Sequence, residues 1–208
     1  KSFIETDKLG GVEPYGASKA MQEIISKCFF ESYFKEKTNI VTVRAGNVLG
    51  GGDWGSDRLI VDIMNSVISD ELMHVRYPYN TRPWQYVLDL IFGYLSLVLK
   101  TSKEKEKNFN SFNFAPKKSF PAIDIINFAK NYWEDKFEFR LNKRKNQIFE
   151  EPKLSIDSKK IYKYLGWQAK GDLTYNLEKT FFWYNSFLKN MNMKKINYNM
   201  IEEFFNNK

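Results

Sequence analysis

The stretch between residues 15 and 44 constrains the fold of this chain more than any other. Apolar side chains recur there at helical spacing, which predicts a helix over residues 15–37. Residues 40–44 (Ile-Val-Thr-Val-Arg) are β-branched and lie between Asn39 and Gly46, as expected of a buried strand. A helix followed at once by a buried strand is half of a βαβ unit, so the sequence predicts an α/β fold with a parallel sheet.

The remaining periodicities extend this pattern along the chain. Further helices are predicted over 57–70, 88–100, 122–133, 157–165 and 172–189, and short strands over 74–77, 85–87, 109–114 and 137–141. A loop is predicted over 46–55, around three consecutive glycines. The Asn- and Lys-rich end of the chain allows only a marginal last helix around Met200 and Phe204.

Cysteine and histidine content excludes several kinds of site. The 208 residues contain one cysteine, Cys28, and one histidine, His74, so we expect no internal disulfide, no metal site and no Ser-His-Asp triad. Cys28 lies among apolar helical positions, which predicts a small buried side chain. The low cysteine content is typical of a reducing compartment and favours a cytoplasmic location.

Charge and hydropathy limit the partners of the chain. Its longest apolar run, residues 87–99, is too short for a membrane span, so no membrane association is predicted. The net charge is +7, with local lysine and arginine concentrations at 100–107 and 140–145 that we interpret as polar surface. This spread favours an enzyme for an anionic substrate over a nucleic-acid-binding protein.

Tyr15 and Lys19 are the first residues that suggest chemistry. Their spacing of four places them on one helix face, about one turn apart. An ammonium near a phenol favours the phenolate, which takes a proton from an alcohol in a hydride-transfer enzyme. The same spacing also occurs by chance on solvated helices, so the pair alone leaves both interpretations open.

Several stretches agree with the catalytic interpretation. They are Pro14-Tyr15-Gly16-Ala17-Ser18-Lys19, Val43-Arg44-Ala45-Gly46-Asn47-Val48-Leu49-Gly50-Gly51-Gly52-Asp53-Trp54, Asp57-Arg58 and Thr81-Arg82-Pro83-Trp84-Gln85-Tyr86-Val87. Together they resemble the extended short-chain dehydrogenase/reductases that act on nucleotide sugars, and within them the branch that dehydrates CDP-glucose. The resemblance continues through residues 113–116 and 165–167 and ends before the last fifteen or so residues.

The resemblance implies a catalytic and cofactor role for the pair. Tyr15 is then the acid/base for the glucose 4-hydroxyl, and Lys19 holds the ribose of the cofactor, NAD. It also implies a homodimer that pairs through the helix over residues 15–37.

The resemblance likewise implies five substrate-binding residues. Asn47 follows a strand end, where ligands of open α/β sheets collect. Arg58 and Arg82 are candidates for the diphosphate of CDP-glucose or a similar nucleotide sugar, and Asp53 and Trp54 for the sugar or nucleotide pocket. Alternatives without a ligand remain open: a surface ion pair for Arg58 and for Arg82, and simple packing for Trp54.

Two parts of the family's machinery have no counterpart in this sequence. One is the glycine-rich turn that receives the NAD pyrophosphate, and the other is the Ser/Thr-Asp-Lys/Glu segment that removes water. Residues 6–8 (Thr-Asp-Lys) lie too close to Tyr15 to be that segment. We therefore expect the C-terminal portion of such an enzyme, inactive alone.

The domain organisation follows from the same interpretation. We expect residues 1–46 to be the remainder of a Rossmann-type parallel sheet and residues 47–190 a mostly substrate-binding mixed α/β domain, interleaved with late Rossmann elements. Residues 191–208 are expected to form a tail.

The expected reaction is the 4,6-dehydration of CDP-glucose in deoxysugar synthesis for surface polysaccharide (O-antigen). The alternatives are another nucleotide-sugar epimerase or reductase and a non-catalytic nucleotide-sugar-binding fragment. Outside the site, we interpret Glu13 as a solvated loop residue and the aromatic residues of 181–187 as core and interface packing.

Overall fold

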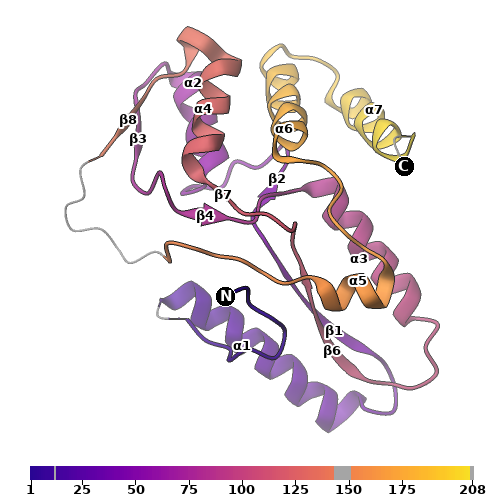
Figure 1. Ribbon diagram of the computed structural model, residues 1–208. Helices are drawn as coiled ribbons and strands as arrows, with labels where there is room; N and C mark the ends of the chain where they lie inside the picture. The colour runs from indigo at the N-terminus through magenta and orange to yellow at the C-terminus, as the bar shows by residue number, and fades with distance from the viewer. Residues whose placement is uncertain (12, 143–150, 207–208) are drawn as a thin grey trace.

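The computed structural model describes residues 1–11, 13–142 and 151–206 of the chain. Its helical elements are α1 (Pro14–Phe29), the π-helix η1 (Phe30–Phe34), α2 (Leu59–Ser69), α3 (Val87–Thr101), α4 (Ala122–Trp133), the 3-10 helix η2 (Glu134–Lys136), α5 (Lys159–Leu165), α6 (Leu173–Leu188) and α7 (Met193–Asn206). Its strands are β1 (Ile40–Ala45), β2 (Val48–Leu49), β3 (Met73–Val75), β4 (Thr81–Arg82), β5 (Gln85–Tyr86), β6 (Phe109–Phe114), β7 (Phe120–Pro121) and β8 (Phe139–Leu141). The fold is therefore α/β, as predicted (Figure 1).

Four strand pairs organise the described chain. Three are parallel, namely β1 with β6, β2 with β5 and β3 with β8, and β4 pairs antiparallel with β7. The longest pair joins Ile40 to Phe109 and runs in register to Ala45 and Phe114. It confirms the parallel pairing expected of the helix–strand unit, with α1 on one side and α3 and α5 on the other (Figure 1).

The expectation that residues 40–44 are buried is wrong in degree. Most of β1 is half-buried and Val43 is 38% exposed. Among the described strands β1 pairs with β6 alone, so its second edge has no neighbour there.

The start of α1 depends on a cap that the sequence interpretation missed. The Glu13 carboxylate accepts hydrogen bonds from the backbone N–H groups of Tyr15 (2.8 Å) and Gly16 (2.5 Å). Glu13 is thus the N-cap of the helix rather than a solvated loop residue, and it satisfies donors that have no partner within the helix.

The apolar face of α1 is exposed. Ile24, Ile25 and Phe29 are each more than half exposed, and Cys28 is exposed as well, so the expectation of a buried thiol is wrong. Amphipathic spacing shows which helix face is apolar but not what covers it. Here the helix meets the sheet through Glu23 instead.

Three apolar clusters stabilise the rest of the described chain. The largest packs α2, α4 and α6 around side chains such as Ile63, Ile125 and Phe181. A second packs α3 and α5 on β6, and a third joins α7 to Tyr86. The last helix is thus confirmed, and it is a firm element because its apolar residues find a partner surface.

The aromatic residues of 181–187 divide into two sets. Phe181 and Tyr184 are fully buried, as predicted for packing residues. Phe182 and Phe187 are 44% and 42% exposed and lie outside the core, so for them interface packing stays a prediction.

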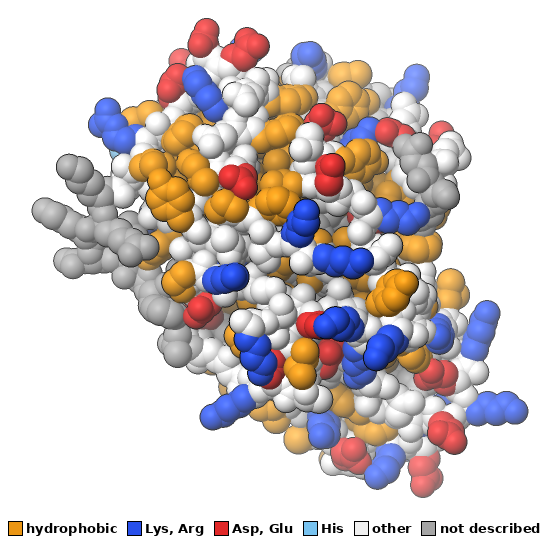
Figure 2. Space-filling model, viewed as in Figure 1, with side chains coloured by type: hydrophobic (Ala, Val, Ile, Leu, Met, Phe, Trp, Pro, Cys, Tyr) orange, Lys and Arg blue, Asp and Glu red, His pale blue; other side chains and the backbone are white. Residues whose placement is uncertain are grey.

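On the face drawn in Figure 2, acidic and basic side chains are mixed. Lys and Arg side chains alternate there with acidic ones below a more apolar upper region. Part of the basic run at 140–145 lies outside the described residues. None of the described helices has the length and apolar character that a membrane crossing requires.

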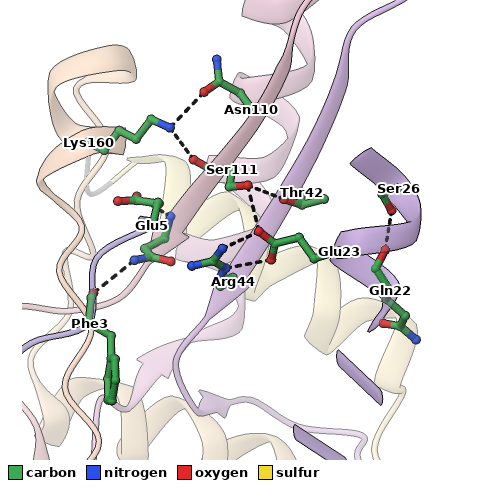
Figure 3. A network of polar contacts seen from close by, with 11 residues as sticks. Phe3, Glu5, Gln22, Glu23, Ser26, Thr42, Arg44, Asn110, Ser111 and Lys160 are labelled. Atoms are coloured by element: carbon green, nitrogen blue, oxygen red, sulfur yellow. Dashed lines mark hydrogen bonds and ion pairs between the residues drawn. The ribbon is translucent and has the colours of Figure 1, made fainter. Parts of the chain in front are cut away.

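A polar network fixes α1 to the sheet (Figure 3). Arg44 of β1 donates to both oxygens of Glu23, with its Nε 2.8 Å from Oε2. The hydroxyl of Ser111 in β6 donates to Glu23 Oε1 (2.9 Å), and Thr42 donates to Ser111 (2.8 Å). The hydrogen bonds from Arg44 hold the pKa of the Glu23 carboxyl below its ordinary value, despite partial burial.

We expect Glu23→Gln to lower the free energy of unfolding by about 2 kcal/mol at pH 7, because it leaves Arg44 half-buried without its charged partner. The depressed pKa of Glu23 means that this stabilisation is present above the carboxyl's unfolded pKa and is lost as the pH falls through the folded value. Urea unfolding measured from pH 7 to pH 3 should therefore show that the free energy of unfolding falls more steeply with pH for the wild type than for the variant. Glu31→Gln, in an exposed pair with Lys35, is the control, and an equal effect there would contradict the role of the network.

Candidate functional site

Asp53, Trp54 and Arg58 belong to the loop that packs against α6. Asn47 and the first turn of α1 lie toward the carboxyl ends of β1 and β6 (Figure 1). These strands are parallel, so both end at the same edge of the sheet. Because α1 runs in the opposite direction to β1, its first turn, with Tyr15, lies toward that same edge (Figure 1). Asn47 follows directly after β1 and is half-buried.

Tyr15 and Lys19 lie together on α1, as their spacing predicts. The Lys19 ammonium lies 5.5 Å from the centroid of the Tyr15 ring and donates a weak hydrogen bond to Gln22 Oε1 (3.4 Å). The Tyr15 side chain is 70% exposed. The phenol and the ammonium are therefore both accessible to a ligand, while their catalytic role stays a prediction.

Asn47 and Arg82 come from segments that are joined by backbone contacts. The Asn47 carbonyl accepts a hydrogen bond from the Gln85 N–H (2.8 Å). A Cβ on Gly46 would lie 2.3 Å from the carbonyl oxygen of Pro83, so the two backbones touch. Arg82 precedes Pro83, and one of its guanidinium nitrogens donates to the Thr81 carbonyl (2.8 Å).

Arg58 forms an ion pair with Asp53, which is the alternative we considered for it. Burial raises the pKa of Asp53, but hydrogen bonds from the Gly55 N–H and from Arg58 outweigh it and hold the pKa below its ordinary value. The arginine side chain is 63% exposed. Its guanidinium remains accessible to a second anion.

Trp54 packs against α6. Its ring lies 5.3 Å from that of Tyr184 and 5.4 Å from that of Phe187, and it stays 42% exposed. The Tyr184 hydroxyl donates to the Asp53 carbonyl (2.7 Å). The packing that we considered for Trp54 is therefore observed. One face of the ring is open, and the role of Trp54 in a pocket stays a prediction.

The three glycines before Asp53 have a packing role that the sequence did not reveal. A Cβ on Gly51 would lie 2.1 Å from the Trp183 ring, and one on Gly50 would lie 2.6 Å from Val87. Gly52 adopts a φ of 86°, which favours glycine. The loop that carries Asp53 is thus pressed onto α6 and α3.

Three buried polar residues near this edge escaped the sequence interpretation. Gln85 is fully buried, Asp89 is 3% exposed and Asn113 is 1% exposed. Asp89 accepts from the Lys170 N–H (3.1 Å), and Asn113 donates to the Phe3 carbonyl (3.2 Å). Gln85 and Asn113 lie in stretches that carry the family resemblance, and Asp89 is a polar residue inside an apolar stretch, but the sequence does not say which segment each one contacts.

No cluster of three His, Cys, Asp or Glu side chains suited to a metal ion occurs within residues 1–11, 13–142 and 151–206. Asp7, in the segment that we rejected as catalytic, forms an exposed ion pair with Lys1 (2.8 Å).

Comparison with known proteins gives a consistent result. Residues 1–180 match the family model described as GDP-mannose 4,6 dehydratase. A CDP-glucose 4,6-dehydratase from Salmonella typhimurium is 31% identical over 199 residues, which cover 92% of this chain and 55% of that protein. The chain thus spans about half the length of this curated relative.

Solved structures share the fold. The dTDP-glucose 4,6-dehydratase of Bacillus anthracis, in complex with NAD, has a TM-score of 0.70 at 17% identity and matches 89% of this chain and 56% of its own. The UDP-glucuronic acid 4-epimerase of Bacillus cereus, in complex with UDP-glucuronic acid and NAD, has a TM-score of 0.73 at 19% identity, with 86% and 55% covered.

We expect Gly51→Ala to lower the free energy of unfolding by about 1–3 kcal/mol, because the added methyl group overlaps the Trp183 ring and forces the loop or α6 to move. Thermal and urea unfolding measure the loss. Gly55→Ala in the same loop is the control, since its Cβ would meet only the flexible Arg58 side chain and Asp53 at 3.3 Å or more. Equal stability of the two variants would contradict the packing role of Gly51.

Proposed function

Because this chain belongs to the GDP-mannose 4,6-dehydratase family of extended short-chain dehydrogenase/reductases, we propose that it is the C-terminal portion of an NAD-dependent CDP-glucose 4,6-dehydratase. The complete enzyme would convert CDP-glucose to CDP-4-keto-6-deoxyglucose with loss of water. The observation that carries the proposal is the accessible Tyr15–Lys19 pair at the carboxyl edge of β1 and β6. The 31% identity to a CDP-glucose 4,6-dehydratase supports a sugar-nucleotide substrate, and CDP-glucose is the one that we propose.

The residues of the pair fit the nicotinamide end of NAD. Lys19 is exposed, and its three ammonium donors suit the two hydroxyls of a ribose. Bound NAD supplies a reversible hydride acceptor for the sugar. We assign the pyrophosphate end of the cofactor to the part of the enzyme that these residues do not form.

Tyr15 is proposed to exchange the proton of the 4-hydroxyl. Its Oη takes that proton as C4 is oxidised, and the ammonium of Lys19 favours the phenolate that this step requires. The exposure of the phenol fits direct contact with a substrate that occupies the edge of the sheet.

Arg82, Arg58 and Asn47 are proposed to bind the nucleotide sugar near its diphosphate. A guanidinium binds phosphate oxygens through paired, charge-assisted hydrogen bonds. Arg58 already holds a carboxylate, that of Asp53, and a phosphate would present the same kind of acceptor. Asp53 and Trp54 complete the proposed pocket.

Two exposed apolar helix faces support the proposal that this chain is part of a larger assembly. One is the face of α1 with Ile24 and Phe29, and the other is the face of α3 with Leu95 and Leu99, which are 60% and 64% exposed. Apolar surface of this kind marks an interface. We propose that the rest of the enzyme and a second subunit cover these faces, with α1 in the homodimer contact.

A second candidate is a nucleotide-sugar 4-epimerase. The TM-score of 0.73 with the UDP-glucuronic acid 4-epimerase is similar to the 0.70 with the dTDP-glucose 4,6-dehydratase. The fold therefore favours the two candidates equally. Both activities would use Tyr15 and Lys19, and only the dehydratase removes the C6 hydroxyl. The product therefore separates the two candidates.

We expect the wild-type chain to bind CDP in a calorimetric titration, and Arg82→Ala to weaken the binding about ten- to a hundredfold, because a charge-assisted contact to the diphosphate is lost. Arg140→Ala is the control, since Arg140 is exposed on β8, which pairs with β3 and carries no residue of the proposed pocket. Unchanged affinity in Arg82→Ala would remove this residue from the pocket, and the absence of CDP binding in the wild type would contradict the nucleotide assignment.

We expect no turnover of CDP-glucose by this chain alone. In an enzyme that joins it to an NAD-binding half, Tyr15→Phe should lower kcat about 10²–10⁴-fold, because the acid/base at the 4-hydroxyl is lost. Tyr162→Phe, at an exposed position on α5, is the control. Formation of the 4-keto-6-deoxy sugar by this chain alone, or full activity of Tyr15→Phe, would contradict the proposal.

A further inference from the structure

Gln85 lies where three chain segments meet. Its side chain is fully buried at the start of β5, which pairs with β2 directly after Asn47. Its N–H donates to the Asn47 carbonyl (2.8 Å), and its side-chain Nε2 donates to the Phe114 carbonyl at the end of β6 (3.0 Å). One residue thus joins the carboxyl ends of both central strands.

The same contacts restrict the residues next to Asn47. The Gly46 N–H donates to the Phe114 carbonyl (3.0 Å), which also accepts from Gln85. On the other side, Gly46 lies against the Pro83 carbonyl, with no room for a Cβ. Both chain neighbours of Asn47 are therefore fixed: Gly46 by these contacts, and Val48 by its pairing with Gln85.

The segment that carries Arg82 is fixed by the same residue and its neighbours. Trp84 is 7% exposed and its indole N–H donates to the Phe120 carbonyl (3.1 Å). Arg82 pairs with Phe120 in the antiparallel β4–β7 pair. The position of the Arg82 backbone relative to Asn47 thus depends on the residues from Pro83 to Gln85.

A buried glutamine is an unfavourable choice if packing is its only role. The Gln85 side-chain oxygen is buried and has no hydrogen-bond partner among the described residues. An apolar side chain of the same size would avoid the desolvation of that oxygen. What the glutamine adds is the directed hydrogen bond to Phe114.

We infer that Gln85 is a positioning residue: its bonds to Asn47 and Phe114 set the Asn47 loop and the Arg82 strand at the spacing that the nucleotide sugar requires. The nucleotide sugar in this inference rests on the proposed function. The contacts of Gln85 with Asn47 and Phe114 do not. Gln85 itself is buried and does not contact the substrate.

The test is the variant Gln85→Met, which keeps the size of the side chain and the backbone N–H but loses the Nε2 donor. We expect amide hydrogen exchange at Gly46 to accelerate about tenfold or more, because the shared anchor at Phe114 is weakened. We also expect CDP to bind several-fold more weakly in calorimetry, while the melting temperature changes little. Gln168→Met, at an exposed position, is the control and should match the wild type in all three measurements.

A purely structural glutamine would give a different result. If Gln85→Met melts at a lower temperature but keeps the wild-type exchange rate at Gly46 and the wild-type affinity for CDP, the inference is wrong. If Gln85→Met does not fold, Gly46→Ala displaces the same contact from the other side, through its clash with Pro83. It should then accelerate exchange at the Gln85 amide, and an unchanged rate there overturns the inference.

The exchange measurement also separates this inference from the proposed function. A wild-type chain that binds no CDP contradicts the nucleotide assignment. The rate at Gly46 in Gln85→Met still decides whether Gln85 positions the loop.

Discussion

Parallel pairing of β1 with β6 is the constraint on which the other elements depend. Six residue pairs in register bring both strands to an end at one edge of the sheet, with Ala45 beside Phe114. The connection between parallel strands must cross from one end of the sheet to the other. Here that connection holds α2, β3, β4, β5 and α3. It leaves β1 with Asn47 and comes back beside Asn47 at Gln85, before α3 crosses to the start of β6. The segments with Arg58 and Arg82 lie between these two points. The polar network of Glu23 and Arg44 then fixes α1, with Tyr15 in its first turn, to the same pair of strands.

The sequence predicts those features that local periodicity determines. The helix over residues 122–133 has the predicted bounds as α4, and the strand over residues 109–114 does as β6. Two of the errors have a common cause. Cys28 is exposed and β1 is only half-buried, because burial depends on a neighbouring segment. The Glu13 cap is a local contact with the next turn of chain, which the apolar spacing does not reveal. Spacing identifies an apolar face, but burial requires a surface that covers it.

The candidate site divides in the same way. The Tyr15–Lys19 pair follows from helical spacing alone, since residues four apart are neighbours on any helix. The contacts of Gln85 with Phe114 and of Gly51 with Trp183 join segments 29 or more residues apart along the chain. A glutamine inside a short strand and a run of glycines are visible in the sequence, but their partners are not. Tertiary packing therefore decides which buried polar groups support a site, and only the structure supplies it.

The buried contacts and the candidate site residues differ in their exposure, and this difference has a physical consequence. Gln85, Phe114 and Tyr184 are buried and fix backbone positions through hydrogen bonds to carbonyl groups. Tyr15 and Arg58 extend from this frame into solvent. Ligand binding would then order a few long side chains while the backbone is already in place, which lowers the entropic cost of binding. The selectivity of such a site resides in the spacing of its anchors, so a change at a buried contact should alter affinity without removing any group that touches the ligand.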